Sequence, residues 1–437
     1  MADILKADNL QKVSGEVPDD LSRLPSLEED RVRDALKQRF DSNQIYTHIN
    51  SLLVAMNPYK KLPLYDQASL EAYNQYGVSS PGPHVYGVAA ATYRGLLDAR
   101  SQSVIISGES GAGKTETAKR FLQFLAYAAT QGSGSSNEGL EERVIATSPL
   151  LEAFGNAQTV MNNNSSRYGK YLMLQFDLSG KIMGASIRTY LLEKTRVVKQ
   201  NKGERSYHIF YFLSNGAPDL KASLKIGDSK YLSLEVDNRG TDEKEAFQEV
   251  KDSMVAIGFD PSELTWVWTF CACIMKLGNI EFGEGEEANL KNPDVVKEIA
   301  GLLRCDANAL SSALCTRRIK AGTDWITSPV APQVACNVRD GLAKATYSRV
   351  FSWMVMRINA NLAILQVDDG GLNRARFFIG ILDIFGFEIF DVNSLEQLCI
   401  NFTNEKLQAT FNQAIFHAAM EENAEEDVNV EVSPTPP

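Results

Sequence analysis

Residues 108–115 read Gly-Glu-Ser-Gly-Ala-Gly-Lys-Thr, and this run constrains the fold more than any other feature of the chain. The apolar run 103–107 ahead of it predicts a strand, and the pattern at 116–129 behind it predicts a helix. The glycines let successive N–H groups point at phosphate oxygens, while Lys114 reaches the outer phosphates and Thr115 is placed for Mg²⁺. The positive end of the following helix faces the anion. Because strand, loop and helix follow in the required order, a nucleoside triphosphate site is favoured over a chance match in a surface loop.

Length, charge and cysteine usage limit the kinds of protein that this chain can be. The 437 residues are too many for one compact core, so two or three subdomains are expected. The net charge is −11, but much of it comes from acidic residues after position 420, so a general nucleic-acid-binding surface is not expected. The six cysteines lack the paired spacing of a zinc site or a disulfide framework, which favours a reducing cytosol. The longest apolar stretch, 265–275, is shorter than a membrane span, so we expect no transmembrane segment and a cytoplasmic chain.

Periodicity and turn signals predict the order of elements. In the first half we expect, in chain order, a short helix at 21–40, an extended segment at 45–56, a loop at 57–65, a flexible connection at 131–139, a helix at 140–154 and a hairpin of 171–176 with 181–187. In the second half we expect a mainly helical part at 217–371 with a long helix at 337–365, a strand at 377–385, and a helix from about Ser394. The acidic segment 421–437 ends in prolines and has no periodicity, so it is expected to be disordered.

Two further segments carry side chains that a triphosphate hydrolase needs. Residues 162–170 read Asn-Asn-Asn-Ser-Ser-Arg-Tyr-Gly-Lys, a polar loop whose hydroxyls can hold Mg²⁺ and phosphate and whose Arg167 can stabilise charge. Residues 383–388 read Asp-Ile-Phe-Gly-Phe-Glu at a predicted strand end, where an Asp can hold metal-bound water and a Gly N–H can approach a γ-phosphate. Alone, the first would be an ordinary polar turn and the second an exposed strand end. With the phosphate loop they form an ordered set.

These three segments resemble the phosphate loop, switch I and switch II of the myosin motor head, in sequence and in order. Further similar stretches lie at 57–60, 151–159, 184–197, 208–211 and 401–407, and the resemblance covers about 19–412. It implies an α/β fold: a P-loop NTPase core with a mixed central sheet flanked by helices, plus a mainly helical upper subdomain, in an incomplete myosin motor domain. The implied parts are a polar extension at 1–18, a nucleotide-binding core at 19–216, an upper actin-binding-type subdomain at 217–371, switch II with the start of the relay helix at 372–420, and the tail at 421–437.

The resemblance also implies the site residues, for ATP and Mg²⁺. Those expected to bind ATP are Asn57, Pro58, Tyr59 and Tyr65 at the adenine, then Gly108, Glu109, Ser110, Gly111, Ala112, Gly113, Lys114, Thr115, Glu116, Asn162 and Asn164. Those expected at the metal are Thr115, Ser166 and, through water, Asp383. Those expected to be catalytic are Ser165, Arg167, Gly386 and Glu388. Arg167 and Glu388 would form the salt bridge that closes switch I on switch II, positions the attacking water and excludes solvent.

The sequence also departs from the family pattern. A myosin head continues past the relay helix into a second actin-binding half, a converter and a lever arm, none of which the sequence contains, so a sliding motor is not expected of this chain alone. Gln158 stands where the family usually has Lys, and Asn163 where it often has Asp. Asp324 lies in the predicted surface loop 317–335, sixteen residues before Asp340, where the family favours an acidic or phosphorylatable residue that regulates actin binding. A solvated turn is the alternative reading of Asp324.

Three functions stay open at this point. The first is an ATPase associated with actin filaments and the cytoskeleton, with no support for light chains. The second is a non-motile fragment that binds ATP, and actin weakly, without productive turnover. The third, an unrelated phosphoryl-transfer enzyme such as a kinase, lacks an acceptor-site signature and does not explain the two switch segments.

Overall fold

The structure is a computed structural model, and it describes residues 17–75, 82–133, 139–363, 376–389 and 393–426. These residues fall into two compact units. The first unit lies within 1–94 and 120–128, and the second within 95–119 and 129–437. No helix of the described residues is long and apolar enough to cross a membrane.

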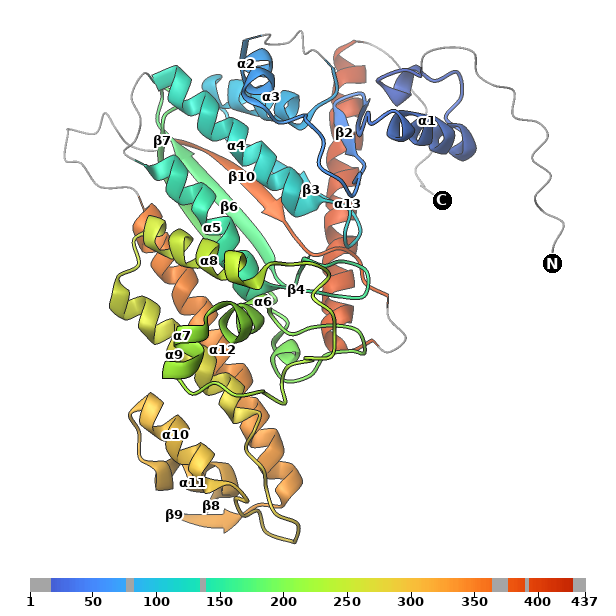
Figure 1. The fold of residues 1–437 in the computed structure, drawn as a ribbon. Coiled ribbons are helices and arrows are strands. Elements are labelled where there is room, and N and C mark those ends of the chain that lie inside the picture. The colour runs from blue at the N-terminus through green and yellow to red at the C-terminus, as the bar shows by residue number, and fades with distance from the viewer. Residues whose placement is uncertain (1–16, 76–81, 134–138, 364–375, 390–392, 427–437) are drawn as a thin grey trace, which may run out of the picture. The chain divides into compact units, whose positions relative to one another are not determined.

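A four-stranded mixed sheet organises the second unit (Figure 1). Its order is β3 (Gln102–Ile106), β10 (Phe377–Asp383), β6 (Gly169–Phe176) and β7 (Ile182–Tyr190). Strands β3 and β10 are parallel, whereas β10 with β6 and β6 with β7 are antiparallel. This is the mixed central sheet that the resemblance implies, so the predicted α/β fold class is confirmed.

The register of this sheet brings the predicted site segments to one edge. Asp383, the last residue of β10, lies opposite Ile106 at the end of β3 and opposite Lys170 near the start of β6. The phosphate loop follows β3, switch I precedes β6, and switch II follows β10. All three therefore begin or end at the same edge of the sheet, where open α/β sheets bind ligands.

Helices cover the sheet and build a mainly helical part beyond it. Helices α5 (Leu140–Gly155) and α12 (Pro332–Leu362) pack against β7. Further helices in this part are α7 (Pro218–Ser223), α8 (Glu243–Ile257), α9 (Pro261–Leu277), α10 (Pro293–Leu303) and α11 (Ala307–Cys315). Helix α9 begins with Pro261 and with a capping box between Asp260 and Glu263, which explains its sharp start.

Several further elements complete the fold up to residue 216. They are η1 (Leu21–Arg23), α2 (Gln67–Gln75), α3 (Val85–Leu97), α4 (Lys114–Ser133), β4 (Asn156–Ala157), β5 (Ser165–Ser166), η2 (Lys194–Val197), α6 (His208–Tyr211) and η3 (Phe212–Gly216). The predicted hairpin of β6 with β7 and the long helix α12 are present, although α12 begins five residues earlier than expected, at Pro332.

Several predicted elements in the first half are wrong in detail. The predicted helix at 21–40 begins only at Glu29, as α1 (Glu29–Asp41), because Pro25 separates it from η1. The predicted extended segment at 45–56 is a hairpin of β1 (Tyr46–Ile49) and β2 (Leu52–Ala55), which turns at Asn50 with a φ of 53°. Asparagine tolerates this left-handed conformation better than most residues.

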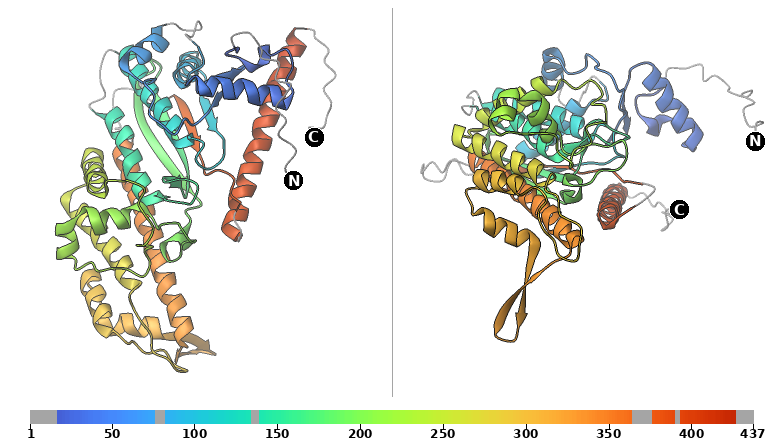
Figure 2. Two further views of the ribbon diagram at one scale, coloured as in Figure 1. Left: turned by 45° about the vertical axis from the view of Figure 1, so that its right-hand side comes forward. Right: turned by 60° about the horizontal axis from the view of Figure 1, so that its bottom comes forward.

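Two later predictions also differ from the structure. The predicted surface loop at 317–335 contains a hairpin of β8 (Thr316–Ala321) and β9 (Asp324–Pro329), visible in Figure 2 as a ribbon beyond the helices. Its two-residue turn starts with Gly322, at a φ of 65°, as tight hairpins favour.

Helix α13 (Leu395–Glu425) continues into the segment expected to be disordered from residue 421, because an existing helix extends easily through glutamates and alanines. Residues 427–437 lie outside the described residues.

One hydrogen bond between α12 and α5 supports the packing of these helices on the sheet. The buried Tyr347 hydroxyl donates to the carbonyl oxygen of Phe154, at 2.6 Å, in the last turn of α5. That carbonyl has no intrahelical partner at a helix end. We expect Tyr347→Phe to lower the free energy of unfolding by about 1–3 kcal/mol, measured by denaturant titration. A change below about 0.5 kcal/mol would contradict this assignment.

Candidate active site

The phosphate loop lies between β3 and α4, as predicted. Gly111 and Gly113 have φ values of 82° and 99°, which glycine adopts without strain. The Lys114 ammonium donates to the carbonyl oxygens of Gly108 and Glu109, at 2.7 Å each, and so bridges the two ends of the loop. Burial lowers the pKa of Lys114 to about 8, against the charges of Asp383, Glu109 and the switch II carboxylate Glu388, which raise it. A bound anion would relieve this cost of burying the ammonium.

Asp383 and Thr115 come together beside this loop. The Thr115 hydroxyl donates to Asp383 Oδ2 at 3.0 Å, across 268 residues of sequence. Asp383 is 5% exposed, and its Oδ1 is buried without a hydrogen-bond partner among the described residues. Burial raises the pKa of Asp383, while Lys170, Thr115 and Lys114 oppose the rise. A buried carboxylate oxygen without a donor, next to a hydroxyl, fits a hard cation such as Mg²⁺.

The described residues hold no cluster of three or more His, Cys, Asp or Glu side chains that could bind a metal by themselves. A cation here would therefore depend on hydroxyls, on Asp383 and on phosphate oxygens, which is how Mg²⁺ binds in nucleotide sites. The Ser166 hydroxyl, the third predicted ligand, donates to the Tyr168 carbonyl oxygen at 2.8 Å. Its lone pairs stay available to a metal while its proton is held there.

Switch I contacts the phosphate loop through Ser165. Its hydroxyl lies 3.4 Å from that of Ser110, and it also accepts a hydrogen bond from Arg167 Nη1 at 3.2 Å. Strand β5, which contains Ser165, pairs with β4 and so fixes the switch on the end of α5. The structure thus brings together Ser110 of the phosphate loop and Ser165 of switch I, two predicted site residues that are 55 positions apart in sequence.

The asparagines of switch I hold the loop itself. Asn164 donates its amide to Glu152 at 3.0 Å and accepts from Asn156 at 2.9 Å. The Asn162 side-chain oxygen accepts from the backbone N–H of Asn164 at 3.0 Å. Their predicted contacts with phosphate stay predictions. The local bonds explain why a run of polar residues forms an ordered loop here.

Gly386 of switch II packs directly on the backbone of the phosphate loop. A Cβ atom added to Gly386 would collide with the backbone nitrogen of Ser110 and with the backbone of Glu109. Only a glycine allows this approach. Switch II therefore lies against the phosphate loop in the structure.

Arg167 and Glu388 form the predicted bridge between the two switches. Arg167 Nη1 and Nη2 donate to the two oxygens of Glu388, at 2.5 and 3.1 Å, in a bidentate pair. Both side chains are buried, at 1% and 4% exposure. The backbone of Glu388 is held by Asn401 of α13, which accepts from its N–H at 2.8 Å and donates to its carbonyl oxygen at 2.7 Å. Switch II is thereby attached both to switch I and to the helix that follows it.

Behind Arg167, outside the predicted site, lie three charged residues that the sequence analysis did not assign, and one of them, Glu193, contacts Arg167. Glu193 accepts a hydrogen bond from Arg167 Nε at 2.6 Å and another from Arg196 Nε at 2.7 Å. Arg196 Nη1 in turn pairs with Glu204 at 3.0 Å. Glu193 and Arg196 lie within 184–197, a stretch that resembles the family but whose charges are not distinguishable there from those of a solvated surface.

The predicted adenine residues belong to the first unit. Tyr59 is 80% exposed, and its N–H donates to the side-chain oxygen of Asn57 at 2.9 Å, which shapes the turn at Pro58. The Tyr65 hydroxyl is 2.8 Å from that of Tyr46, and the Arg120 guanidinium lies over the Tyr65 ring at 4.4 Å. The adenine assignment of these residues stays a prediction.

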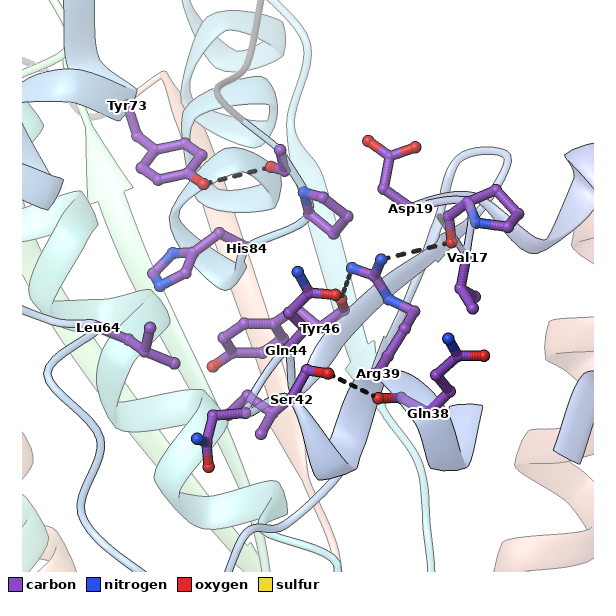
Figure 3. A pocket seen from close by; sticks show the side chains of 15 residues that line it. Val17, Asp19, Gln38, Arg39, Ser42, Gln44, Tyr46, Leu64, Tyr73 and His84 are labelled. Atoms are coloured by element: carbon purple, nitrogen blue, oxygen red, sulfur yellow. Dashed lines mark hydrogen bonds between the residues drawn. The ribbon is translucent and has the colours of Figure 1, made fainter. Parts of the chain in front are cut away.

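A cavity of about 800 Å³ lies in the same unit (Figure 3). It is lined by Tyr46, Leu64, Tyr73, His84 and Arg39 among others, and none of the four predicted adenine residues lines it. Arg39 is engaged in the wall, since its Nε donates to Thr47 and its Nη2 to the Tyr46 carbonyl oxygen, at 2.9 Å each. The cavity therefore shares no lining residue with the predicted nucleotide site.

Asp324, the predicted regulatory position, is the first residue of β9 and is exposed. It pairs with Ala321 across the turn of the hairpin. Its role at an actin interface stays a prediction.

Comparison with known proteins decides the family. The sequence profile described as "Myosin head (motor domain)" matches residues 18–433. The chain belongs to the myosin head family. The match runs beyond Asn412, where the resemblance derived from motifs ends, so the helical segment after it is myosin head sequence too. Similar proteins include Myosin-8 and Myosin-17 of Arabidopsis thaliana, each 40% identical over 98% and 94% of this chain, and Myosin type-2 heavy chain 1 of Schizosaccharomyces pombe, 42% identical over 94%.

The chain spans less than a third of these myosins, namely 29%, 27% and 27% of their lengths. Family membership therefore identifies the type of domain. The activity and the partners of the whole myosins are only proposed for this chain.

Proposed function

We propose that this chain is the ATP-binding and ATP-hydrolysing part of a myosin-type, actin-based cytoskeletal motor, in which closure of switch I on switch II gates hydrolysis. The observation that carries the proposal is the buried bidentate pair of Arg167 and Glu388, together with Gly386 packed on the phosphate loop. Three segments far apart in sequence meet there, and each carries a group that phosphoryl transfer requires. The alternative hypothesis of a kinase does not explain the Arg167–Glu388 pair between the two switches.

The geometry supports a role for each of these residues. The backbone N–H groups of 108–115 and Lys114 bind the phosphates. Thr115, Ser166 and Asp383 are the residues that would hold Mg²⁺, which when bound neutralises charge on the transferred phosphoryl group. Ser165 and Gly386 lie against the phosphate loop and are suited to orient the attacking water, while the Arg167–Glu388 pair keeps bulk solvent out.

Phosphate release by the purified chain tests the proposal, with and without actin filaments. Hydrolysis that actin stimulates supports a motor ATPase. ATP binding without release supports the alternative, a myosin-like fragment without productive turnover. Absence of ATP binding contradicts both. The actin partner, the cytoskeletal location and the regulatory role of Asp324 rest on family membership, and the stimulated rate tests the first of them.

Lys114→Ala should weaken nucleotide binding itself. The ammonium bridges the loop at 2.7 Å from two carbonyl oxygens and is partly desolvated, so a charge-assisted bond to phosphate is lost with it. We expect the Kd for a fluorescent ATP analogue to rise about 10- to 100-fold, which corresponds to about 1.5–3 kcal/mol. Lys297→Ala is the control, since Lys297 is exposed and, among the described residues, pairs only with Asp294 on the surface. Equal affinity of the two variants would refute the phosphate-loop assignment.

A further inference from the structure

Arg167 has two buried carboxylate partners, one on each of two edges of its guanidinium. Its Nη1 and Nη2 face Glu388 of switch II, while its Nε donates to Glu193 Oε2 at 2.6 Å. Glu193 lies between β7 and η2, and its backbone is fixed in place. Its N–H donates to the Arg167 carbonyl oxygen at 3.0 Å, and its own carbonyl oxygen accepts from the Tyr207 hydroxyl at 2.7 Å.

The buried charges of Arg167 and of the three residues linked to it on the side away from Glu388 cancel one another. Arg167, Glu193, Arg196 and Glu204 alternate in sign along a chain of contacts at 2.6, 2.7 and 3.0 Å. Their side chains are 1%, 10%, 2% and 1% exposed. These two cations and two anions sum to zero, and Glu388 adds one further negative charge. A buried arginine without a counter-ion is unstable, but here Glu193 already supplies one.

We propose that Glu193 is a positioning residue of switch closure: it holds Arg167 by Nε whether or not Glu388 is in contact, so that opening of switch II breaks only the contacts that Nη1 and Nη2 make with Glu388. This inference rests on the proposed function. Glu388 can separate from Arg167 independently of Glu193, because its backbone is held by Asn401 of α13, whereas the backbone of Glu193 is held by Arg167 itself and by Tyr207. The planar guanidinium, fixed at Nε, then presents its remaining N–H groups in one direction for Glu388 to meet.

Quenched-flow measurement of the phosphate burst tests the proposal on the full chain, with Glu193→Gln and, as matched control, Glu204→Gln. Both residues are buried carboxylates that contact Arg196, but only Glu193 contacts Arg167. We expect the burst rate of Glu193→Gln to fall about tenfold or more, with the Kd for a fluorescent ATP analogue changed less than about threefold. Glu204→Gln should retain the burst. Equal loss in both variants, or an unchanged burst in Glu193→Gln, overturns the proposal.

If Glu193→Gln does not fold, Glu193→Asp replaces it, because the aspartate keeps the charge but has a shorter reach. A slowed burst at unchanged affinity supports the proposal, and a burst like that of the wild type overturns it.

A wild-type chain that binds ATP without a burst refutes the proposed hydrolysis, and thermal unfolding without nucleotide then decides the role of Glu193. Glu193→Gln combined with Glu388→Gln leaves Arg167 without a carboxylate, so Tm should fall by more than the sum of the two single shifts. Glu204→Gln combined with Glu388→Gln should be additive. Additive shifts in the first pair overturn the inference.

Discussion

Arg167→Ala should abolish the phosphate burst while ATP binding survives. Arg167 contacts Glu388, Glu193 and Ser165, so the substitution removes switch closure and leaves the phosphate loop intact. Without closure, the attacking water is not positioned and solvent enters the site. We expect the rate of the hydrolysis step to fall at least about 100-fold, with the Kd for a fluorescent ATP analogue changed less than about threefold.

A second buried arginine provides the control for lost stability. Arg205 pairs with Glu243 at 2.7 Å and lies over the ring of Tyr211, at 3.6 Å from its centroid. Breaking either buried pair should cost about 3–5 kcal/mol of stability, but Arg205 contacts neither switch II nor the phosphate loop in these interactions. The control variant is Arg205→Ala. Its Tm should fall together with that of Arg167→Ala, but only Arg167→Ala should lose the phosphate burst. Wild-type phosphate release by Arg167→Ala would refute its role in closure.

Gly386→Ala should stop hydrolysis by a different route, through steric hindrance. The added methyl group would meet the backbone of Ser110 and Glu109, which cannot move aside as a flexible side chain would. Switch II is then displaced from the phosphate loop, and Glu388, two residues later, is displaced with it. We expect about a 100-fold or greater loss in the burst rate with the phosphate loop still able to bind nucleotide.

Gly341→Ala is the matched control for the glycine substitution. Gly341 lies within α12, and apart from the nearby backbone of that helix a Cβ atom there meets no atom of the described residues within 4 Å. The substitution should raise stability by about 0.5–1 kcal/mol, because alanine favours the helix, and it should leave the burst unchanged. Similar burst rates for Gly386→Ala and Gly341→Ala would show that contact of Gly386 with the loop is not required.

Local sequence signals predict the phosphate loop, whereas the roles of the two switch segments came from the resemblance to the family. Glycine spacing and the flanking strand and helix are local properties, and they predict Gly108–Thr115 without knowledge of the rest of the chain. The resemblance supplied the partnership of Arg167 with Glu388, which are 221 residues apart. The register of β10 between β3 and β6 is non-local, and hydrophobic pattern alone does not choose the neighbour of a strand.

The sequence analysis also missed the buried ion pairs behind Arg167, because hydrophobic periodicity does not show whether a charged residue is buried. Glu193, Arg196 and Glu204 are polar residues in a polar stretch, and such residues are usually exposed. They are buried here because each charge meets an opposite charge: Glu193 and Arg196 pair locally, while Arg167 and Glu204 extend the chain of pairs at its two ends. The hairpin β8–β9 was missed for a related reason, since its strands are exposed on both faces and so lack the alternation of a half-buried strand.

Quenched-flow measurement of a single turnover of MgATP by the purified wild-type chain tests the central claim most directly. The claim is that the phosphate loop and the two switches form a hydrolytic site closed by Arg167 and Glu388. It predicts a burst of protein-bound phosphate ahead of the steady state, present in the wild type and absent in Arg167→Ala. A wild-type chain that binds MgATP at the phosphate loop but shows no burst would contradict it.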